Sequence, residues 1–147
     1  AAVAKLCRAR GLSVLRRSAG GVPDPAADVV IGDTVGELAL LQATASIVLV
    51  GGSLVPHGGH NPLEAAAWGV PTVCGPHMDN FAAVTRQLVA AGAMIQLMPQ
   101  QLTSCLSDLL GDAERRDSMG AAAEHLVEAN RGALGQLLGL IDDQLAA

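Results

Sequence analysis

Residues 46–64 read Ser-Ile-Val-Leu-Val-Gly-Gly-Ser-Leu-Val-Pro-His-Gly-Gly-His-Asn-Pro-Leu-Glu, and this stretch decides the fold. Its apolar first part, residues 46–50, is typical of a buried strand. Four glycines then allow the backbone to turn and to approach another group closely. A helix is predicted from Asn61, a preferred N-cap residue, because Pro62 has the backbone angle of a first helical residue. A strand, a glycine-rich loop and a helix start in this order favour a site for an anionic ligand.

The alternation of strand and helix patterns continues on both sides of this stretch. Short apolar segments rich in Val, Ile and Leu predict further strands at residues 12–15, 29–31, 70–74 and 94–97. Helical patterns separate them at residues 1–10, 34–45, 61–68 and 79–89, the last capped by Asp79 or Asn80. Strands that alternate with single helices predict an α/β fold, a doubly wound, Rossmann-like parallel sheet covered by helices.

The remainder of the chain, from residue 99, is predicted to be helical in pieces. Breaks are expected at Gly111 and around Arg131 and Gly132, and residues 134–145 form a last helix with a regular apolar face. No internal repeat and no second domain boundary is found. Residues 1–147 are therefore predicted to form a single domain with helices closing its C-terminal end.

Composition excludes several classes of protein. Half of the 147 residues are apolar and 16% are charged, which is typical of a globular domain. The net charge of −5 and the absence of a basic stripe argue against nucleic-acid binding. No apolar run approaches the roughly 20 residues of a membrane span, and no signal-peptide pattern is present, so a soluble chain is expected. It begins inside a helical pattern without a methionine, as a fragment of a longer protein would.

The cysteines predict neither a disulfide framework nor a metal site. Cys7, Cys74 and Cys105 are odd in number and widely spaced, which favours reduced thiols in a cytoplasmic setting. Cys74 and His77 are three residues apart, but further ligands of the same kind are missing. We therefore expect no metal and no cofactor.

Two predicted helix starts follow the carboxyl ends of neighbouring strands, where ligands bind in open parallel sheets. They are the segments Thr34 to Glu37 and Asn61 to Glu64, each with the residue spacing of a capping box. In one interpretation Glu37 and Glu64 only complete these caps. In the other, each carboxylate accepts hydrogen bonds from ribose hydroxyls. The glycine pairs favour the second interpretation, because a cap alone does not need them.

Several other polar or small residues near these turns are candidate phosphate or sugar contacts: Thr34, Gly52, Ser53, Gly58, Gly59 and His60. His57 and His60 could donate to a phosphate or transfer a proton, although loop histidines are more often surface residues. Ser53 does not lie in a G-x-S-x-G elbow, and neither G-x-G-x-x-G nor a P-loop is present. The two large aromatic residues, Trp68 and Phe81, occupy apolar helix positions and are predicted to pack in the core.

The motifs together resemble a known family. They are G-D-T-V-G-E-L at residues 32–38, V-G-G-S-L at 50–54, G-G-H-N-P-L-E at 58–64, G-V-P at 69–71 and G-P-H at 75–77, followed by Asn80 and Phe81. In order and spacing they are similar to the C-terminal half of 3-deoxy-D-manno-octulosonic acid (Kdo) transferases. The resemblance runs along essentially the whole chain, and the combination of the first and third motifs makes it specific.

The resemblance implies a GT-B glycosyltransferase, in which two Rossmann-like domains enclose the active site. Such enzymes transfer Kdo from CMP-Kdo to a lipid A precursor at the cytoplasmic face of the bacterial inner membrane, in lipopolysaccharide synthesis. This chain would be the nucleotide-sugar-binding domain. Its nucleotide contacts would come from Val35, Gly36 and Glu37 and from Asn61, Pro62, Leu63 and Glu64.

The resemblance also implies what the chain lacks. The catalytic carboxylate, the membrane-associating segment and the lipid-binding cleft belong to the family's N-terminal domain, and a basic P-R-H motif precedes residue 1. No catalytic residue is therefore assigned here, and the fragment alone is expected to be soluble and inactive, with weak CMP binding and possible self-association. Val35 replaces the family's usual methionine, and Ala65 replaces a frequent proline.

Two other functions remain open at this point. A GT-B domain for a different donor, such as a UDP-sugar, would share the same strand and loop order. A non-catalytic α/β interaction module would use the same loops only as capped turns.

Overall fold

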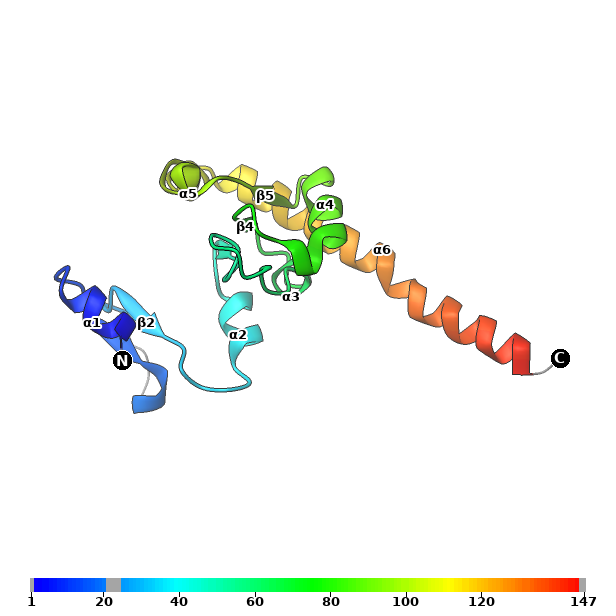
Figure 1. The fold of residues 1–147 in the computed structure, drawn as a ribbon, viewed down its shortest axis with the longest axis horizontal. Coiled ribbons are helices and arrows are strands. Elements are labelled where there is room, and N and C mark those ends of the chain that lie inside the picture. Colours follow the sequence, from blue (N-terminus) through cyan, green and yellow to red (C-terminus); the bar gives the residue numbers. More distant parts are fainter. Residues whose placement is uncertain (1, 21–24, 146–147) are drawn as a thin grey trace. The chain divides into compact units, whose positions relative to one another are not determined.

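The computed structural model of the chain describes residues 2–20 and 25–145, with side chains as far as Asn130. The chain forms two compact units, Ala1–Leu41 and Gln42–Ala147. Each unit contains parallel strands, and we describe each by itself (Figure 1).

The first unit contains one pair of parallel strands. Helix α1 (Ala2–Arg8) leads to strand β1 (Val14–Arg16) and the 3-10 turn η1 (Arg17–Ala19), and strand β2 (Val29–Ile31) follows. Val14 pairs with Val29 and Arg16 with Ile31, so the carboxyl ends of both strands lie at one edge. Helix α2 (Leu38–Ala43) begins at the end of this unit.

The second unit contains a three-stranded parallel sheet in the order β3-β4-β5, and its elements follow one another along the chain. They are β3 (Val48–Leu49), α3 (Leu63–Ala66), β4 (Thr72–Cys74), η2 (Asp79–Phe81), α4 (Ala82–Ala90), β5 (Met94–Gln96), η3 (Pro99–Gln101), α5 (Leu102–Gly111) and α6 (Ala113–Leu145). The predicted α/β class and parallel pairing are confirmed. The hydrogen-bonded strands lie in two sheets, one in each unit.

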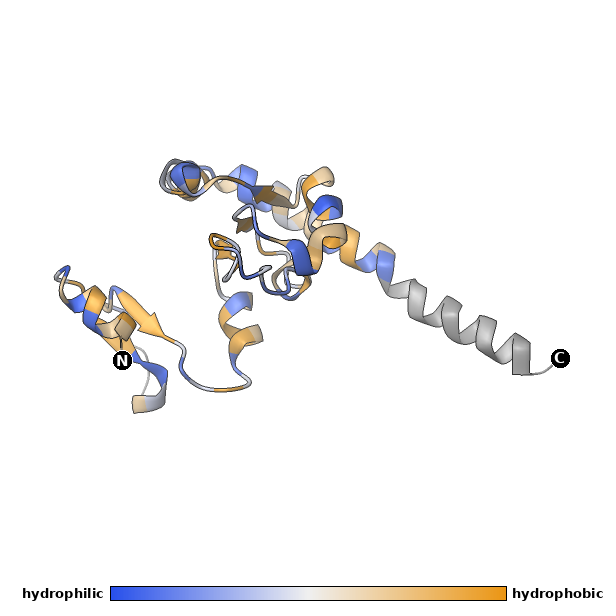
Figure 2. Cartoon of the chain, viewed as in Figure 1, coloured by the Kyte–Doolittle hydropathy of each residue, from blue (hydrophilic) through white to orange (hydrophobic). Residues whose placement is uncertain are grey.

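Strand β4 organises the core of the second unit, because its three residues are all buried. Successive residues of a strand point to opposite faces, and Val73 and Cys74 accordingly belong to two different apolar clusters. Cys74 packs in a cluster with Ala66 of α3, Leu88 of α4 and Ala123 of α6. Val73 packs in a cluster with Leu97, with Leu109 of α5 and with Met119 of α6. Helices therefore cover both faces of this sheet, as a doubly wound fold requires. Helix α4 contains both hydrophobic and hydrophilic residues, which is typical of a helix that covers a sheet (Figure 2).

Several predicted helix boundaries are wrong. Helix α4 is not capped by Asp79 or Asn80; these residues form the turn η2, and the helix begins at Ala82. The predicted break near Arg131 and Gly132 is absent, because α6 is continuous from Ala113 to Leu145. A glycine inside a helix costs only about 1 kcal/mol, which neighbouring residues of a long helix offset. The predicted apolar face of residues 134–145 lies outside the described side chains.

The predicted break at Gly111 is confirmed, because α5 ends there and α6 begins at Ala113. Hydrogen bonds between neighbouring residues explain why a new helix begins at this point. The side chain of Asp112 accepts a hydrogen bond of 2.9 Å from the backbone N–H of Arg115, which is an N-cap of α6. Nearby, the guanidinium group of Arg116 donates to the carbonyl oxygens of Leu109 and Leu110 at the end of α5. One short connection thus satisfies free backbone groups of both helices.

Trp68 is not in the core, contrary to the prediction. Its side chain is half exposed, whereas Ala65 and Ala66 of the same helical segment are buried. The buried face of α3 therefore contains small residues, and Trp68 lies in the turn after the helix. Phe81 is half-buried and packs against the cluster around Cys74, as predicted.

Burial also determines the reactivity of the cysteines. Loss of hydration raises the pKa of the buried Cys74 thiol to about 11, whereas Cys7 and Cys105 are only half-buried. At pH 8 only about one Cys74 in a thousand is a thiolate, the reactive form.

Iodoacetamide at pH 8 should therefore label Cys7 and Cys105 of the native chain well before Cys74, as measured by peptide mass spectrometry. All three should react equally in urea, and equal rates in the native chain would contradict the assignment.

Among the helices of the described part of the chain, none has the length and apolar character that crossing a membrane requires.

Candidate functional site

The loop after β3 folds back on itself as a narrow hairpin. The backbone N–H of Gly59 donates to the Gly52 carbonyl at 3.2 Å, and that of His60 donates to the Gly51 carbonyl at 3.1 Å. Gly52 has a φ of 69°, a conformation that only glycine adopts without strain. The loop is therefore an ordered structure, with the side chains of His57 and His60 exposed on its surface.

Ser53 anchors this loop to the turn that follows β4. Its side chain is fully buried, and its hydroxyl group donates to the Val50 carbonyl at 2.6 Å and accepts from the Gly75 N–H at 2.9 Å. The Ser53 carbonyl accepts a further hydrogen bond from the His77 N–H at 3.0 Å. The Ser53 side chain, predicted as a phosphate or sugar contact, therefore holds the protein's own backbone together.

Gly58 and Gly59 pack against the segment that follows β4. Both are buried and have positive φ angles of 81° and 73°. A Cβ atom on Gly58 would overlap the side-chain amide of Asn80, and one on Gly59 would overlap the sulfur of Met78. We expected these glycines to clear the way for a ligand; in the structure they make room for the protein's own side chains.

The start of α3 matches the predicted cap in part. The Asn61 side-chain oxygen accepts a hydrogen bond of 3.1 Å from the Leu63 N–H. The N-cap position of α3 is occupied by the buried Pro62, which forms no side-chain cap. The carboxylate of Glu64 lies 3.4 Å from the side-chain nitrogen of Asn61, a long contact with the side chain and not with the backbone. Glu64 is exposed, so most of its capacity as a hydrogen-bond acceptor is available to a ligand.

The second candidate turn, residues 33–37, lies in the first unit. Helix α2 begins only at Leu38, and the Glu37 carbonyl accepts from the Leu41 N–H at 3.1 Å. The hydroxyl group of Thr34 donates to the Glu37 carboxylate, whereas in the predicted capping box it would accept from a backbone N–H group. Gly36 has a φ of 86°, and the Val35 side chain is fully exposed.

Two arginines that sequence reasoning missed contact this turn. Arg17 donates from Nη2 to Oε1 of Glu37 at 2.8 Å, and Arg16 donates from Nε to Oδ2 of Asp33 at 2.7 Å. Both follow or end strand β1, and its parallel partner β2 ends just before Asp33. The sequence offered a signal for this contact, namely two adjacent arginines directly after a predicted strand. Because the carboxyl ends of parallel strands lie at one edge of a sheet, these arginines lie near the residues that follow the neighbouring strand.

Both carboxylates of this turn are held in the ionised state. Hydrogen bonds from the Thr34 hydroxyl group and then the charge of Arg17 lower the pKa of Glu37. The pKa of Asp33 falls to about 2, because the backbone N–H and hydroxyl group of Ser18 donate to it and Arg16 lies beside it. In the ionised state these groups are acceptors only.

The lowered pKa of Asp33 gives a pH dependence with a definite sign. Because its pKa lies below the ordinary value of 3.8, its contribution to the stability of the first unit is complete above that value. The contribution is lost as the pH falls through about 2. A carboxyl-carbon NMR titration should give a midpoint near 2 for Asp33, and Ser18→Ala should move it upward. A midpoint near 4 in the unsubstituted chain would show that the hydrogen bonds are not formed.

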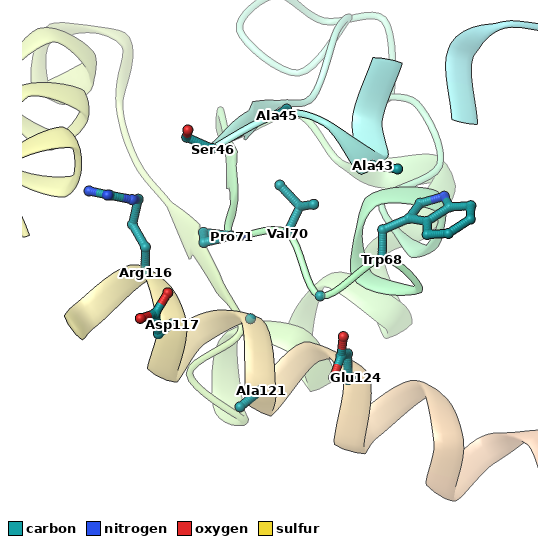
Figure 3. A pocket seen from close by; sticks show the side chains of 12 residues that line it. Ala43, Ala45, Ser46, Trp68, Val70, Pro71, Arg116, Asp117, Ala121 and Glu124 are labelled. Atoms are coloured by element: carbon teal, nitrogen blue, oxygen red, sulfur yellow. The ribbon is translucent and has the colours of Figure 1, made fainter. Parts of the chain in front are cut away.

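A cavity of about 510 Å³ lies elsewhere in the second unit (Figure 3). Trp68 lines one end, Arg116 and Asp117 line another, and Glu124 of α6 lies along its floor. Its residues Ser46 and Pro71 precede β3 and β4, so it lies toward the amino ends of these strands. The candidate residues of the glycine loop follow the carboxyl ends and do not line this cavity.

The structure thus distributes the predicted site residues between its two units. Val35, Gly36 and Glu37 belong to the first unit, and Asn61, Pro62, Leu63 and Glu64 belong to the second. Among residues whose side chains are described, no group of three or more His, Cys, Asp or Glu residues is arranged to hold a metal ion.

Parallel strands with helices on both faces of the larger sheet, and polar turns at the strand carboxyl ends, define the class as a Rossmann-like α/β domain. The solved C-terminal CMP-Kdo binding domain of WaaA from Acinetobacter baumannii is similar, with a TM-score of 0.77 and 32% identity. The likeness covers 84% of this chain and 65% of that one. The chain belongs to the Kdo transferase family and corresponds to the C-terminal, GT-B-type domain of its members.

Curated relatives give the same result over nearly the whole chain. The Kdo transferase of Haemophilus influenzae is 37% identical over 145 residues, which are 97% of this chain and 34% of the relative. That of Bordetella pertussis is 41% identical over 141 residues, which are 94% of this chain and 33% of the relative. The chain therefore spans about a third of the length of these relatives. No family model matches it.

Proposed function

We propose that this chain is the donor-binding domain of a Kdo transferase and holds the CMP part of CMP-Kdo. The observation that carries the proposal is the likeness to the solved CMP-Kdo binding domain over 84% of the chain. In this proposal residues 1–147 are one nucleotide-sugar-binding domain.

The candidate turns have the chemistry that a cytidine nucleotide needs. The hydrogen-bond donors of CMP are its ribose hydroxyls and the amino group of cytosine, and ionised carboxylates accept from both. Glu37 and Glu64 supply two exposed or half-exposed carboxylates, and the fully exposed Val35 offers an apolar contact to the base.

In the whole enzyme the reaction is a direct displacement at the anomeric carbon of CMP-Kdo. A hydroxyl oxygen of the lipid A precursor forms the new bond and gives its proton to the catalytic carboxylate, and CMP leaves with the electron pair of the broken bond. The domain contributes by positioning the donor and by stabilising the negative charge of the leaving phosphate. The family resemblance implies that the catalytic carboxylate, the lipid-binding cleft and the contact with the inner membrane belong to the N-terminal domain of such an enzyme.

Calorimetric titration of the 147-residue chain with CMP, UMP and UDP tests the proposal. We expect CMP to bind at least about tenfold more tightly than either uridine nucleotide, a difference of about 1.4 kcal/mol. Preference for a uridine nucleotide would assign the chain to a UDP-sugar enzyme. If none of the three nucleotides binds, the remaining alternative is that the chain is a non-catalytic interaction module.

A second assay concerns the activity of the chain alone. With CMP-Kdo and a lipid A precursor, it should transfer no Kdo, because it carries no assigned catalytic carboxylate. Light scattering in the same buffer tests for self-association, which we expect if apolar surface is left exposed.

A further inference from the structure

Arg17 joins two segments that are 20 residues apart in sequence at the edge of the first unit. It is the first residue of η1, directly after β1, and its Nη2 atom donates to Oε1 of Glu37 at 2.8 Å. Oε2 of the same carboxylate accepts from the hydroxyl group of Thr34. Because each oxygen is held by a different residue, the plane of the Glu37 carboxylate is fixed.

The fixed carboxylate remains able to bind a ligand. The exposed fractions of the two side chains are 38% for Arg17 and 29% for Glu37, so solvent reaches both. Each carboxylate oxygen has a second lone pair, which leaves two acceptor positions beyond those used by Arg17 and Thr34. Glu37 is therefore an oriented and ionised acceptor before any ligand arrives.

An exposed ion pair of this kind contributes little to the stability of a fold, because water and salt screen it. Its effect on binding is larger, since a glutamate that is already held in place loses less rotational freedom when a ligand engages it. The Arg17–Glu37 pair is thus suited to organising a site more than to stabilising the unit.

We propose that Arg17 is a positioning residue for the donor nucleotide, acting through the Glu37 carboxylate. The inference rests on the proposed function, in which Glu37 receives hydrogen bonds from the nucleotide. Arg17 itself need not touch the ligand. Its guanidinium group keeps the carboxylate oriented.

The test is a double-mutant cycle measured as CMP affinity by calorimetry, with Arg17→Met, Glu37→Gln and the double variant. Arg17→Met should weaken CMP binding roughly tenfold while the melting temperature stays within about 2 °C of the unsubstituted chain. The double variant should bind no more weakly than Glu37→Gln alone, because Arg17 acts through that carboxylate. Arg17→Lys should recover part of the loss, since an ammonium group still pairs with one oxygen.

Arg10→Met is the matched control, because it removes the same charge from an exposed position in the same unit. It should leave CMP affinity unchanged. If Arg17→Met binds CMP as the unsubstituted chain does, the inference is wrong and the proposed function stands. Additive losses in the double variant would also overturn it, because Arg17 would then contact the nucleotide directly. An unsubstituted chain that binds no CMP would overturn both.

Discussion

Replacing Gly75 by alanine should lower the free energy of unfolding by about 3 kcal/mol, the upper end of the usual cost of overpacking a core. Gly75 is buried in the turn after β4, and a Cβ atom there would lie 2.6 Å from the carbonyl carbon and still closer to the carbonyl oxygen of Ser53. It would also lie 2.8 Å from the Cα atom of Leu54. These are backbone atoms, which cannot move aside as a flexible side chain would.

The surrounding hydrogen bonds make this strain difficult to relieve. Ser53 is held by Val50, Gly75 and His77, so displacing its carbonyl group breaks contacts in two loops. Urea unfolding measures the change, and calorimetry on the same variant should show weakened CMP binding, because the glycine loop is displaced.

Gly111→Ala is the control for this substitution. Gly111 is the last residue of α5, and a Cβ atom there would meet nothing within 4 Å. Alanine in a helix is favoured over glycine by up to about 1 kcal/mol, so this variant should be equally or more stable. If Gly75→Ala unfolds at the same urea concentration as Gly111→Ala, the turn relaxes and the close approach is not a constraint.

Replacing Glu64 by alanine should weaken CMP binding by a factor of roughly ten to one hundred. A hydrogen bond to a charged group contributes about 1.5 to 3 kcal/mol, and this carboxylate is the exposed acceptor at the start of α3. The melting temperature should change by less than about 2 °C, because the side chain makes only a long contact of 3.4 Å with Asn61.

The same experiment separates the two interpretations of this residue. If CMP affinity is unchanged and the melting temperature falls by several degrees, Glu64 is only a helix cap. Glu114→Ala removes an exposed glutamate from the first turn of another helix, α6, and serves as the control. It should leave CMP affinity unchanged, which shows that the loss at residue 64 does not arise from net charge.

The order of strands and helices was predictable because each strand is a short apolar run and most helices are followed by glycine. The parallel pairing and the turn at the glycine loop were both predicted from local patterns. These features depend on neighbours within a few residues, so a single sequence contains enough information to find them.

The missed features depend on residues far apart in the chain. Glu37 takes its partner from Arg17, and Ser53 takes its partner from Gly75, which no local spacing reveals. The spacing of Thr34 and Glu37 suited a capping box, but α2 begins later and their side chains bond to each other. Gly58 and Gly59 signalled a close approach to the backbone, and the side chains of Asn80 and Met78 are the groups that approach them.

The buried hydroxyl group of Ser53 has a consequence for the order in which the chain assembles. Its acceptor, Val50, is three residues away, whereas its donor, Gly75, is 22 residues further along and lies beyond β4. The loop after β3 therefore cannot complete its hydrogen bonds until β4 has paired with β3. A chain emerging from the ribosome displays the whole motif G-G-H-N-P-L-E before this happens, yet it has no formed site. Under the proposed function, the nucleotide is therefore recognised only after the sheet is assembled.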